Sequence, residues 1–184
     1  DRLPAYLFGR LNDLKLSMRR EGIDILDFGM GNPDLSAPVH VVDKLREVAG
    51  DAKAHRYSAS RGIPHLRKAV AQSYRRKFGV DLDWETEVIA CLGSKEGLAH
   101  LMLALLDSGD TVLVPNPTYP VHIYSVVIAG GNVISIPLHE ERDFVPDMEE
   151  ITREIWPKPK VMIFSFPHNP TTAVVEKEFF EEIV

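Results

Sequence analysis

Residues 87–106 read EVIACLGSKEGLAHLMLALL, and this stretch decides the fold class. It begins with a short apolar run and passes through two glycines that enclose a serine, a lysine and a glutamate. Apolar residues then recur at helical spacing from Leu98 to Leu106. This pattern is typical of a strand that leads directly into a helix. The sequence therefore predicts a strand over 87–91 and a helix over 94–106, joined by a glycine turn.

Three more short apolar runs follow, and helix-length segments separate them. The runs are nearly continuous in their hydrophobicity, as in strands that are buried on both faces. Their alternation with helices predicts βαβ units, a parallel sheet and an α/β fold. The expected strands are TVLVP (111–115), NVISIPL (132–138) and KVMIFSF (160–166), and the expected helices are 94–106, 119–129 and 147–155.

The residues before 87 have helical patterns of their own. An apolar face over 64–78, opened by Pro64, predicts one helix, and residues 8–21 predict another. A short extended piece, DILDFGMG, ends at Gly31. The last residues, EKEFFEEIV, again have a helical pattern.

Composition and charge exclude several classes of protein. The 184 residues carry a formal net charge of −6, without the clustered basic surface that nucleic-acid phosphates require. No apolar run approaches the roughly 20 residues that span a bilayer, and the first residues lack a signal peptide's apolar core. The single cysteine, Cys91, cannot form an internal disulfide, and its apolar surroundings predict a buried thiol. A reducing, cytoplasmic setting is expected.

Three unusual stretches directly follow predicted strands, where open parallel sheets bind their ligands. The stretch GSKEG suits a phosphate, because it combines glycines, the N–H groups at the start of a helix, Ser94 and Lys95. The same pattern would also arise if Ser94 were an ordinary N-cap. In PNPTYP, the Tyr119 ring can stack on a flat ligand or simply pack at the edge of a core. In FPHNPTT, Asn169 presents an outward amide or forms an Asn-Pro turn. His168 is interpreted as polar surface.

Two further candidate site residues come before the GSKEG turn in the sequence. Tyr57, in YSASRGIPHLR, is a neutral donor that suits a phosphate, or else an ordinary surface residue. Gly31, in DFGMGNPD, has a backbone N–H that a carboxylate can approach, but a turn that ends a strand explains it equally well. No nucleotide-binding glycine motif is present.

Taken in order, DFGMGNPD, HRYSASRGIPHLR, GSKEGLAHL, PNPTYP and FPHNPTT resemble the motifs of class I aminotransferases, the fold-type I enzymes that use pyridoxal 5′-phosphate (PLP). The resemblance covers essentially the whole chain. It implies a three-layer α/β/α fold with a mostly parallel sheet, of which only part is present. Residues 1–31 would form an N-terminal arm and the start of the small domain, and residues 32–184 the N-terminal part of the PLP-binding large domain.

The resemblance implies a role for each matching residue. Ser94 and Lys95 would hold the cofactor phosphate, Tyr119 would stack on the pyridine ring, and Asn169 would hydrogen-bond the 3′-oxygen of that ring. Tyr57 would reach the phosphate in the neighbouring subunit, which implies a homodimer with composite sites.

The resemblance also implies two substrate contacts, and the sequence departs from the family pattern in two respects. Gly31 would meet the substrate carboxylate through its backbone, and Tyr6 matches a substrate-contacting tyrosine. Thr172 stands where many relatives have glycine. None of the lysines present is in the context of the family's Schiff-base lysine, which is expected beyond Val184. No catalytic residue is therefore assigned in this segment, and the 184 residues alone are expected to be inactive.

The detailed sequence of these motifs is most similar to that of bacterial glutamate–pyruvate (alanine) aminotransferases. It implies amino transfer between alanine or glutamate and pyruvate or 2-oxoglutarate. The nearest alternative is LL-diaminopimelate aminotransferase. A PLP β-lyase or an aminocyclopropane carboxylate synthase shares the same cofactor contacts. Two alternatives of another class are a PLP-sensing regulatory domain and a noncatalytic protein that binds a phosphate compound.

Overall fold

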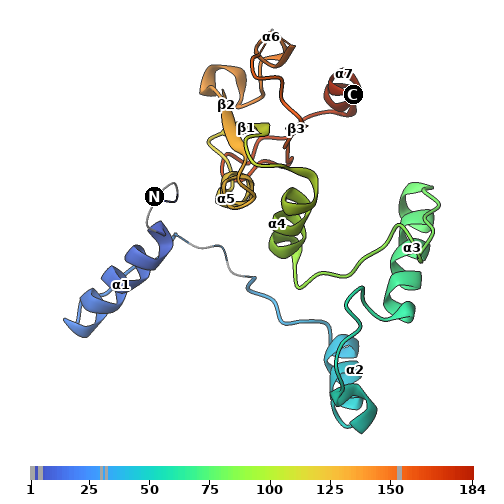
Figure 1. Cartoon of the computed structure of the whole chain (residues 1–184). Coiled ribbons are helices and arrows are strands. Elements are labelled where there is room, and N and C mark those ends of the chain that lie inside the picture. Colours follow the sequence, from blue (N-terminus) through green and yellow to red (C-terminus); the bar gives the residue numbers. More distant parts are fainter. Residues whose placement is uncertain (1–2, 4–5, 30, 32, 153–154) are drawn as a thin grey trace. The chain divides into compact units, whose positions relative to one another are not determined.

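The computed structural model describes residues 3, 6–29, 31, 33–152 and 155–184 (Figure 1). The chain divides into two compact units, one of residues 4–90 and the other of residues 1–3 with 91–184. The first unit contains α1 (Leu7–Arg20), α2 (Val39–Ala49), the 3-10 helix η1 (Ala52–His55) and α3 (Pro64–Phe78). The second contains α4 (Ser94–Leu105), β1 (Thr111–Asn116), α5 (Pro120–Ile128), β2 (Asn132–Pro137), the 3-10 helix η2 (Glu140–Arg142), α6 (Met148–Thr152), β3 (Val161–Met162) and α7 (Lys177–Ile183).

The three strands form one parallel sheet in the order β2-β1-β3. Thr111 lies opposite Asn132, and Val112 lies opposite Val161. Because α5 lies between β1 and β2 in the chain, this pairing is a βαβ unit, and the predicted α/β class with a parallel sheet is confirmed. The last strand is shorter than expected, since the predicted 160–166 is reduced to Val161–Met162.

The core of this unit lies around β1, the central strand. Its residues from Thr111 to Pro115 are all buried, as the continuous apolar run predicts. Helices α4 and α5 supply the apolar side chains that cover it. The buried cluster consists of Met102, Leu106, Val112, Val114, Val126 and Ile163.

The strand predicted over 87–91 is not formed. A strand needs a hydrogen-bonded neighbour, and none of the described strands pairs with this segment. For the same reason Cys91 is exposed rather than buried. Val88 is the one residue of this run that is buried.

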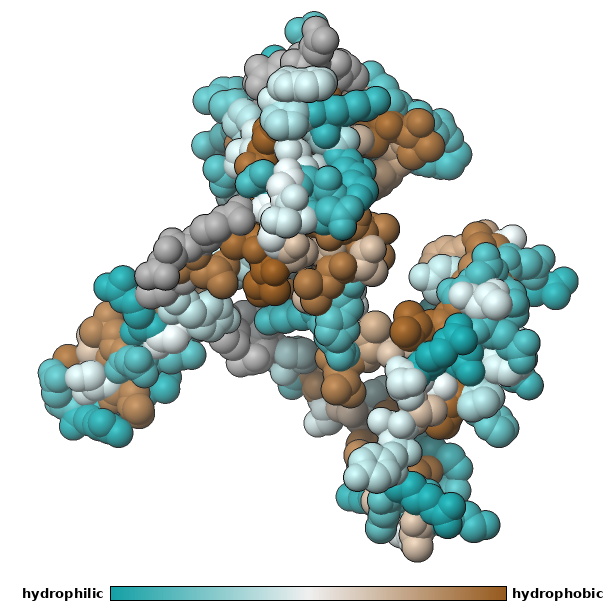
Figure 2. Space-filling model, in the orientation of Figure 1, coloured by the Kyte–Doolittle hydropathy of each residue, from teal (hydrophilic) through white to brown (hydrophobic). Residues whose placement is uncertain are grey.

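In residues 4–90, three helices carry apolar side chains that the unit itself leaves uncovered. On α1 the exposed residues Leu7, Leu11 and Leu14 recur at helical spacing, and Figure 2 shows hydrophobic beside hydrophilic surface there. Helix α3 runs over the predicted 64–78, from Pro64 at its first position to Gly79 in the left-handed conformation. Helix α2 has no counterpart among the predicted helices.

Among the described residues, no helix combines the length and the hydrophobicity that crossing a membrane requires.

Candidate functional site

The glycine turn before α4 is built around Gly93. This residue is the N-cap of α4, with φ +95° and ψ 162°, a conformation that a side chain would strain. The Leu92 backbone N–H donates to the Glu96 carboxylate, which closes the turn. The alternative that Ser94 caps the helix is therefore wrong, because Ser94 is the first residue of the helix itself.

The start of α4 carries the donors that an anion requires. Backbone N–H groups in the first turn of a helix have no intrahelical acceptor and carry a partial positive charge. The exposed side chains of Ser94 and Lys95 add a hydroxyl and an ammonium group at the same end. A phosphate matches this set of donors.

The end of β1 brings an aromatic ring to the same place. After Asn116 the chain turns through Pro117 and Thr118, and Tyr119 becomes the N-cap of α5. The Nζ atom of Lys95 lies 5.5 Å from the centre of the Tyr119 ring. The structure thus brings two of the predicted site residues together, from different elements of one unit.

The same unit contains two buried histidines, His122 and His168. His122, the third residue of α5, packs edge-on against Tyr119 at 5.9 Å between ring centres. Burial lowers the pKa of His122, and a positive charge on His168 would lower it further. Burial also lowers the pKa of His168. Both shifts favour the neutral form of the ring.

Each histidine has a threonine partner. Nδ1 of His122 lies 2.8 Å from Oγ1 of Thr118, and Nδ1 of His168 lies 2.8 Å from Oγ1 of Thr171. Within the described part of the chain, Nε2 of His168 is buried without a hydrogen-bond partner. The interpretation of His168 as polar surface is wrong, since only 3% of it is exposed. A lone histidine has no periodic signal that could have revealed this burial.

Asn169 follows His168 in the loop after β3. The loop is closed by two backbone hydrogen bonds, from Thr172 N–H to the His168 carbonyl (2.7 Å) and from His168 N–H to the Ala173 carbonyl (2.8 Å). The Asn169 side chain is exposed. Because parallel strands end at the same edge of a sheet, the loops after β1 and β3 both leave from that edge. Thr172 has φ +64°, a conformation that favours glycine.

The other predicted site residues belong to residues 4–90. Tyr57 is fully exposed, at 106% of its reference area. Gly31 is exposed, and a side chain added there would meet nothing within 4 Å. Tyr6 is the N-cap of α1, and its ring lies 5.8 Å from that of Phe8. The roles of these three residues stay predictions.

The residues around α4 and Tyr119 fit a ligand that combines a phosphate with a flat ring. Gly93 leaves the backbone open at the first turn of α4, Ser94 and Lys95 supply phosphate donors, and Tyr119 supplies a surface for stacking. The described residues contain no group of three or more His, Cys, Asp or Glu side chains that could hold a metal ion. PLP has this combination of phosphate and ring.

Comparison with known proteins gives a consistent result. The family described as aminotransferase class I and II matches residues 23–184. The chain is 56% identical over 184 residues to glutamate-pyruvate aminotransferase AlaC of Escherichia coli K12, covering 100% of this chain and 45% of that protein. It is 41% identical over 182 residues to LL-diaminopimelate aminotransferase of Syntrophobacter fumaroxidans, covering 99% and 47%.

A solved structure agrees with the sequence relatives. Aspartate aminotransferase from Thermus thermophilus, determined with maleate, superimposes with a TM-score of 0.90 at 35% identity. The match covers 98% of this chain and 47% of that one. The chain therefore spans about half the length of the proteins that it matches.

Proposed function

This chain belongs to the class I and II aminotransferase family, and we propose that it is the N-terminal part of a PLP-dependent enzyme. The proposed reaction moves an amino group between an amino acid and a 2-oxo acid. The observation that carries the proposal is the placement of Lys95 Nζ 5.5 Å from the Tyr119 ring at the N-terminus of α4. There a phosphate site adjoins a stacking surface.

Each cofactor contact has a proposed residue. Ser94 and Lys95 hold the phosphate, Tyr119 stacks on the pyridine ring, and Asn169 donates its amide to the 3′-oxygen. Tyr57 donates its hydroxyl to the phosphate in the neighbouring subunit of a homodimer. When bound, PLP supplies an electron sink for the α-carbon of the amino acid.

The side chains of this chain position and orient the reactants. The Lys95 charge neutralises the phosphate, which anchors one end of the cofactor. The Tyr119 ring fixes the plane in which the pyridine lies, and the His122 ring supports it edge-on from the side. Gly31 and Tyr6 are proposed to contact the substrate, with the Gly31 backbone facing the substrate carboxylate.

The proposed substrates are alanine or glutamate with pyruvate or 2-oxoglutarate. Support comes from the 56% identity with the glutamate-pyruvate enzyme, against 41% with the LL-diaminopimelate enzyme. That second activity remains the alternative substrate assignment. A PLP β-lyase is the alternative reaction.

Further parts of the proposal concern the whole protein. Residues 1–31 form an arm and the start of a small domain, and residues 32–184 belong to the large domain. The 184 residues alone do not transaminate, because none of their lysines is in the context of the covalent PLP lysine. The enzyme is cytoplasmic.

The test uses the full-length protein with PLP. Formation of pyruvate and glutamate from L-alanine and 2-oxoglutarate is expected, and LL-diaminopimelate serves as the rival donor. Release of ammonia and pyruvate from a cysteine conjugate, without amino exchange, would favour the lyase. No change in the cofactor absorbance with any amino acid would contradict the proposal.

A pair of variants links the activity to this site. Tyr119→Ala removes the stacking ring and is expected to weaken PLP binding by up to about tenfold, since one aromatic stack contributes ~0.5–1.5 kcal/mol beyond the area that it buries. Tyr119→Phe keeps the ring and should bind PLP much as the unmodified protein does. Equal losses in both variants would place the importance of this residue in its hydroxyl group instead.

A further inference from the structure

Tyr57 lies between two hydrogen-bonded points of the chain, one made by a side chain and one by the backbone. On its N-terminal side, Nε2 of His55 is 3.0 Å from the Ala49 carbonyl oxygen at the end of α2. On its C-terminal side, Gly62 N–H donates to the Ala59 carbonyl oxygen at 2.8 Å, which closes a tight turn. The exposed Tyr57 side chain is therefore two residues away from a hydrogen-bonded residue on either side, His55 and Ala59.

Gly62 lies against Ala90, in the segment that precedes α4. The Ala90 N–H donates to the Arg61 carbonyl oxygen at 3.1 Å. Gly62 has φ +87°, and a Cβ atom placed on it would lie 2.5 Å from the Cβ of Ala90. No side chain fits at that distance, so any substitution must move the turn away from Ala90.

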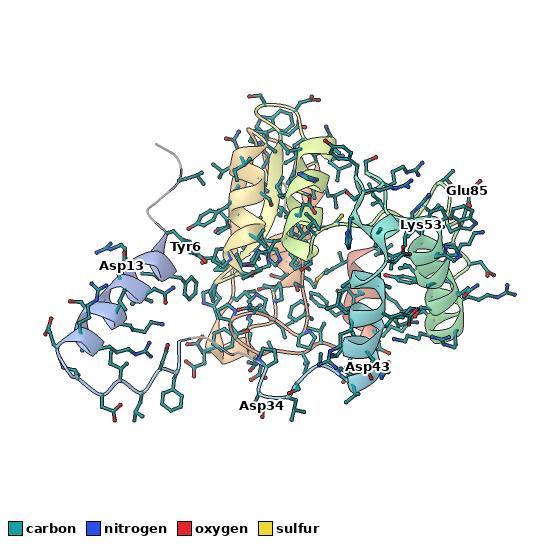
Figure 3. All side chains as sticks on the ribbon, turned by 90° about the horizontal axis from the view of Figure 1, so that it is seen from below. Tyr6, Asp13, Asp34, Asp43, Lys53 and Glu85 are labelled. Carbon is teal, nitrogen blue, oxygen red and sulfur yellow. The ribbon has the colours of Figure 1, made fainter. Side chains whose placement is uncertain are left out.

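Arg67, one turn into α3, joins the turn at Gly62 to the chain at Trp84. Its Nε donates to the Gly62 carbonyl oxygen at 3.1 Å, and its Nη1 donates to the Trp84 carbonyl oxygen at 3.0 Å. The guanidinium carbon also lies 5.0 Å from the centre of the Trp84 ring. The neighbouring Glu85, whose carbonyl accepts from Arg61, lies beside α3 in Figure 3.

We propose that Gly62 and Arg67 are positioning residues that fix Tyr57 for its contact with the cofactor phosphate of the neighbouring subunit. This inference rests on the proposed function, which assigns that contact to Tyr57. A tyrosine on a free loop loses conformational entropy each time it binds, and a fixed backbone reduces that loss. The Gly62–Ala90 contact and the Arg67 hydrogen bonds supply the fixed backbone.

The central test compares two glycines that flank α3. Gly62→Ala introduces both an unfavourable φ and a clash with Ala90. Gly79→Ala introduces the unfavourable φ alone, since Gly79 has φ +69° and a Cβ atom would meet nothing within 4 Å. In the full-length apoprotein, the Kd for PLP is expected to rise about tenfold for Gly62→Ala, the size of one lost hydrogen bond to a charged group. For Gly79→Ala it should stay within about twofold of the unmodified value.

A rescue variant tests whether the clash is the cause. Ala90→Gly removes the Cβ atom that lies 2.5 Å away, and the next nearest atoms are at 3.6 and 3.7 Å, ordinary contact distances. The double variant Gly62→Ala with Ala90→Gly should recover most of the PLP affinity. Persistence of the whole loss in the double variant would overturn the role of the Gly62–Ala90 contact.

A double-mutant cycle of Gly62→Ala and Tyr57→Phe tests whether the loss of PLP affinity passes through Tyr57. Tyr57→Phe removes only the hydroxyl and should itself weaken PLP binding about tenfold. If Gly62 acts by positioning that hydroxyl, Gly62→Ala adds little to Tyr57→Phe, because the contact is already lost. Full additivity of the two losses would show a general structural effect and would overturn the inference.

Arg67→Lys provides an independent variant that keeps the charge. Lysine cannot reproduce the planar fork that joins two carbonyl oxygens, so a part of the PLP affinity should be lost. Pyridoxal, which lacks the phosphate, should bind equally well to the unmodified protein, Gly62→Ala and Arg67→Lys. An equal loss of pyridoxal binding would overturn the inference.

The outcomes separate this inference from the proposed function. If the full-length protein binds no PLP, the proposed function fails. If Tyr57→Phe weakens PLP binding but Gly62→Ala and Arg67→Lys do not, the proposed function stands and the positioning role is wrong.

Discussion

The two units of the chain hold their predicted site residues in different ways. In residues 91–184, Tyr119 follows β1, the central strand of the sheet, in which Val112 and Val114 are 0% exposed. In residues 4–90, helices α1, α2 and α3 contain no buried residue, and Tyr57 is held through local backbone contacts. The position of Tyr119 thus depends on a buried core, whereas the position of Tyr57 depends on a turn and one glycine.

The largest effect expected from this comparison is on the core of residues 91–184. Met102→Ala removes a side chain that is 2% exposed and should lower the free energy of unfolding of the full-length apoprotein by about 2–5 kcal/mol. His100→Ala, at an exposed position of the same helix, should change it by less than about 0.5 kcal/mol. Denaturant unfolding measures both. Similar losses in the two variants would contradict the location of this core.

The second effect is a dependence of stability on pH that belongs to the same unit. The pKa values of His122 and His168 are lowered from 6.5 in the folded protein, mainly by burial. The unfolded chain therefore binds protons first as the pH falls. The stabilisation is complete above about pH 6.5 and is lost as the pH falls toward the lower folded pKa values.

Variants of the histidines sharpen this second prediction. His122→Asn and His168→Asn should each reduce the slope of stability against pH between about pH 5 and 7. An unchanged slope in both buried variants would contradict the account of this pair.

The smallest effect concerns the loop that carries Asn169. Thr172 has φ +64°, and a β-branched residue there is strained by about 1–2 kcal/mol. Thr172→Gly relieves the strain but loses chain entropy in the unfolded state, for a net gain of up to about 1 kcal/mol. Val174→Gly, in the same loop without a positive φ, should destabilise instead. Thermal unfolding distinguishes the two, and a loss of stability in Thr172→Gly would contradict the strain at this position.

Much of the fold could be predicted where local chemistry decides it. Pro64 and Gly79 mark the two ends of α3, and the continuous apolar run of β1 marks a buried strand. The predicted strand over 87–91 failed because a strand also depends on a partner, which no local pattern contains. The exposure of Cys91 has the same cause.

In the candidate site, too, local sequence reveals some residues, whereas others depend on contacts between distant segments. Ser94, Lys95 and Tyr119 could be singled out from the sequence because a glycine turn precedes α4 and a proline-containing turn follows β1. His122 and His168 could not, since their burial depends on how α5 and the loop after β3 fold against each other. The importance of Gly62 likewise depends on Ala90, which lies 28 residues further along the sequence.

The most direct test of the central claim is the affinity of the full-length apoprotein for PLP and for pyridoxal, measured for the unmodified protein and for Lys95→Ala. If Lys95 holds the phosphate, the substitution weakens PLP binding by about tenfold or more and leaves pyridoxal binding unchanged, because only PLP carries the charge that Lys95 neutralises. Unchanged affinity for PLP, or an equal loss for both compounds, would contradict the assignment of the α4 N-terminus as the phosphate site.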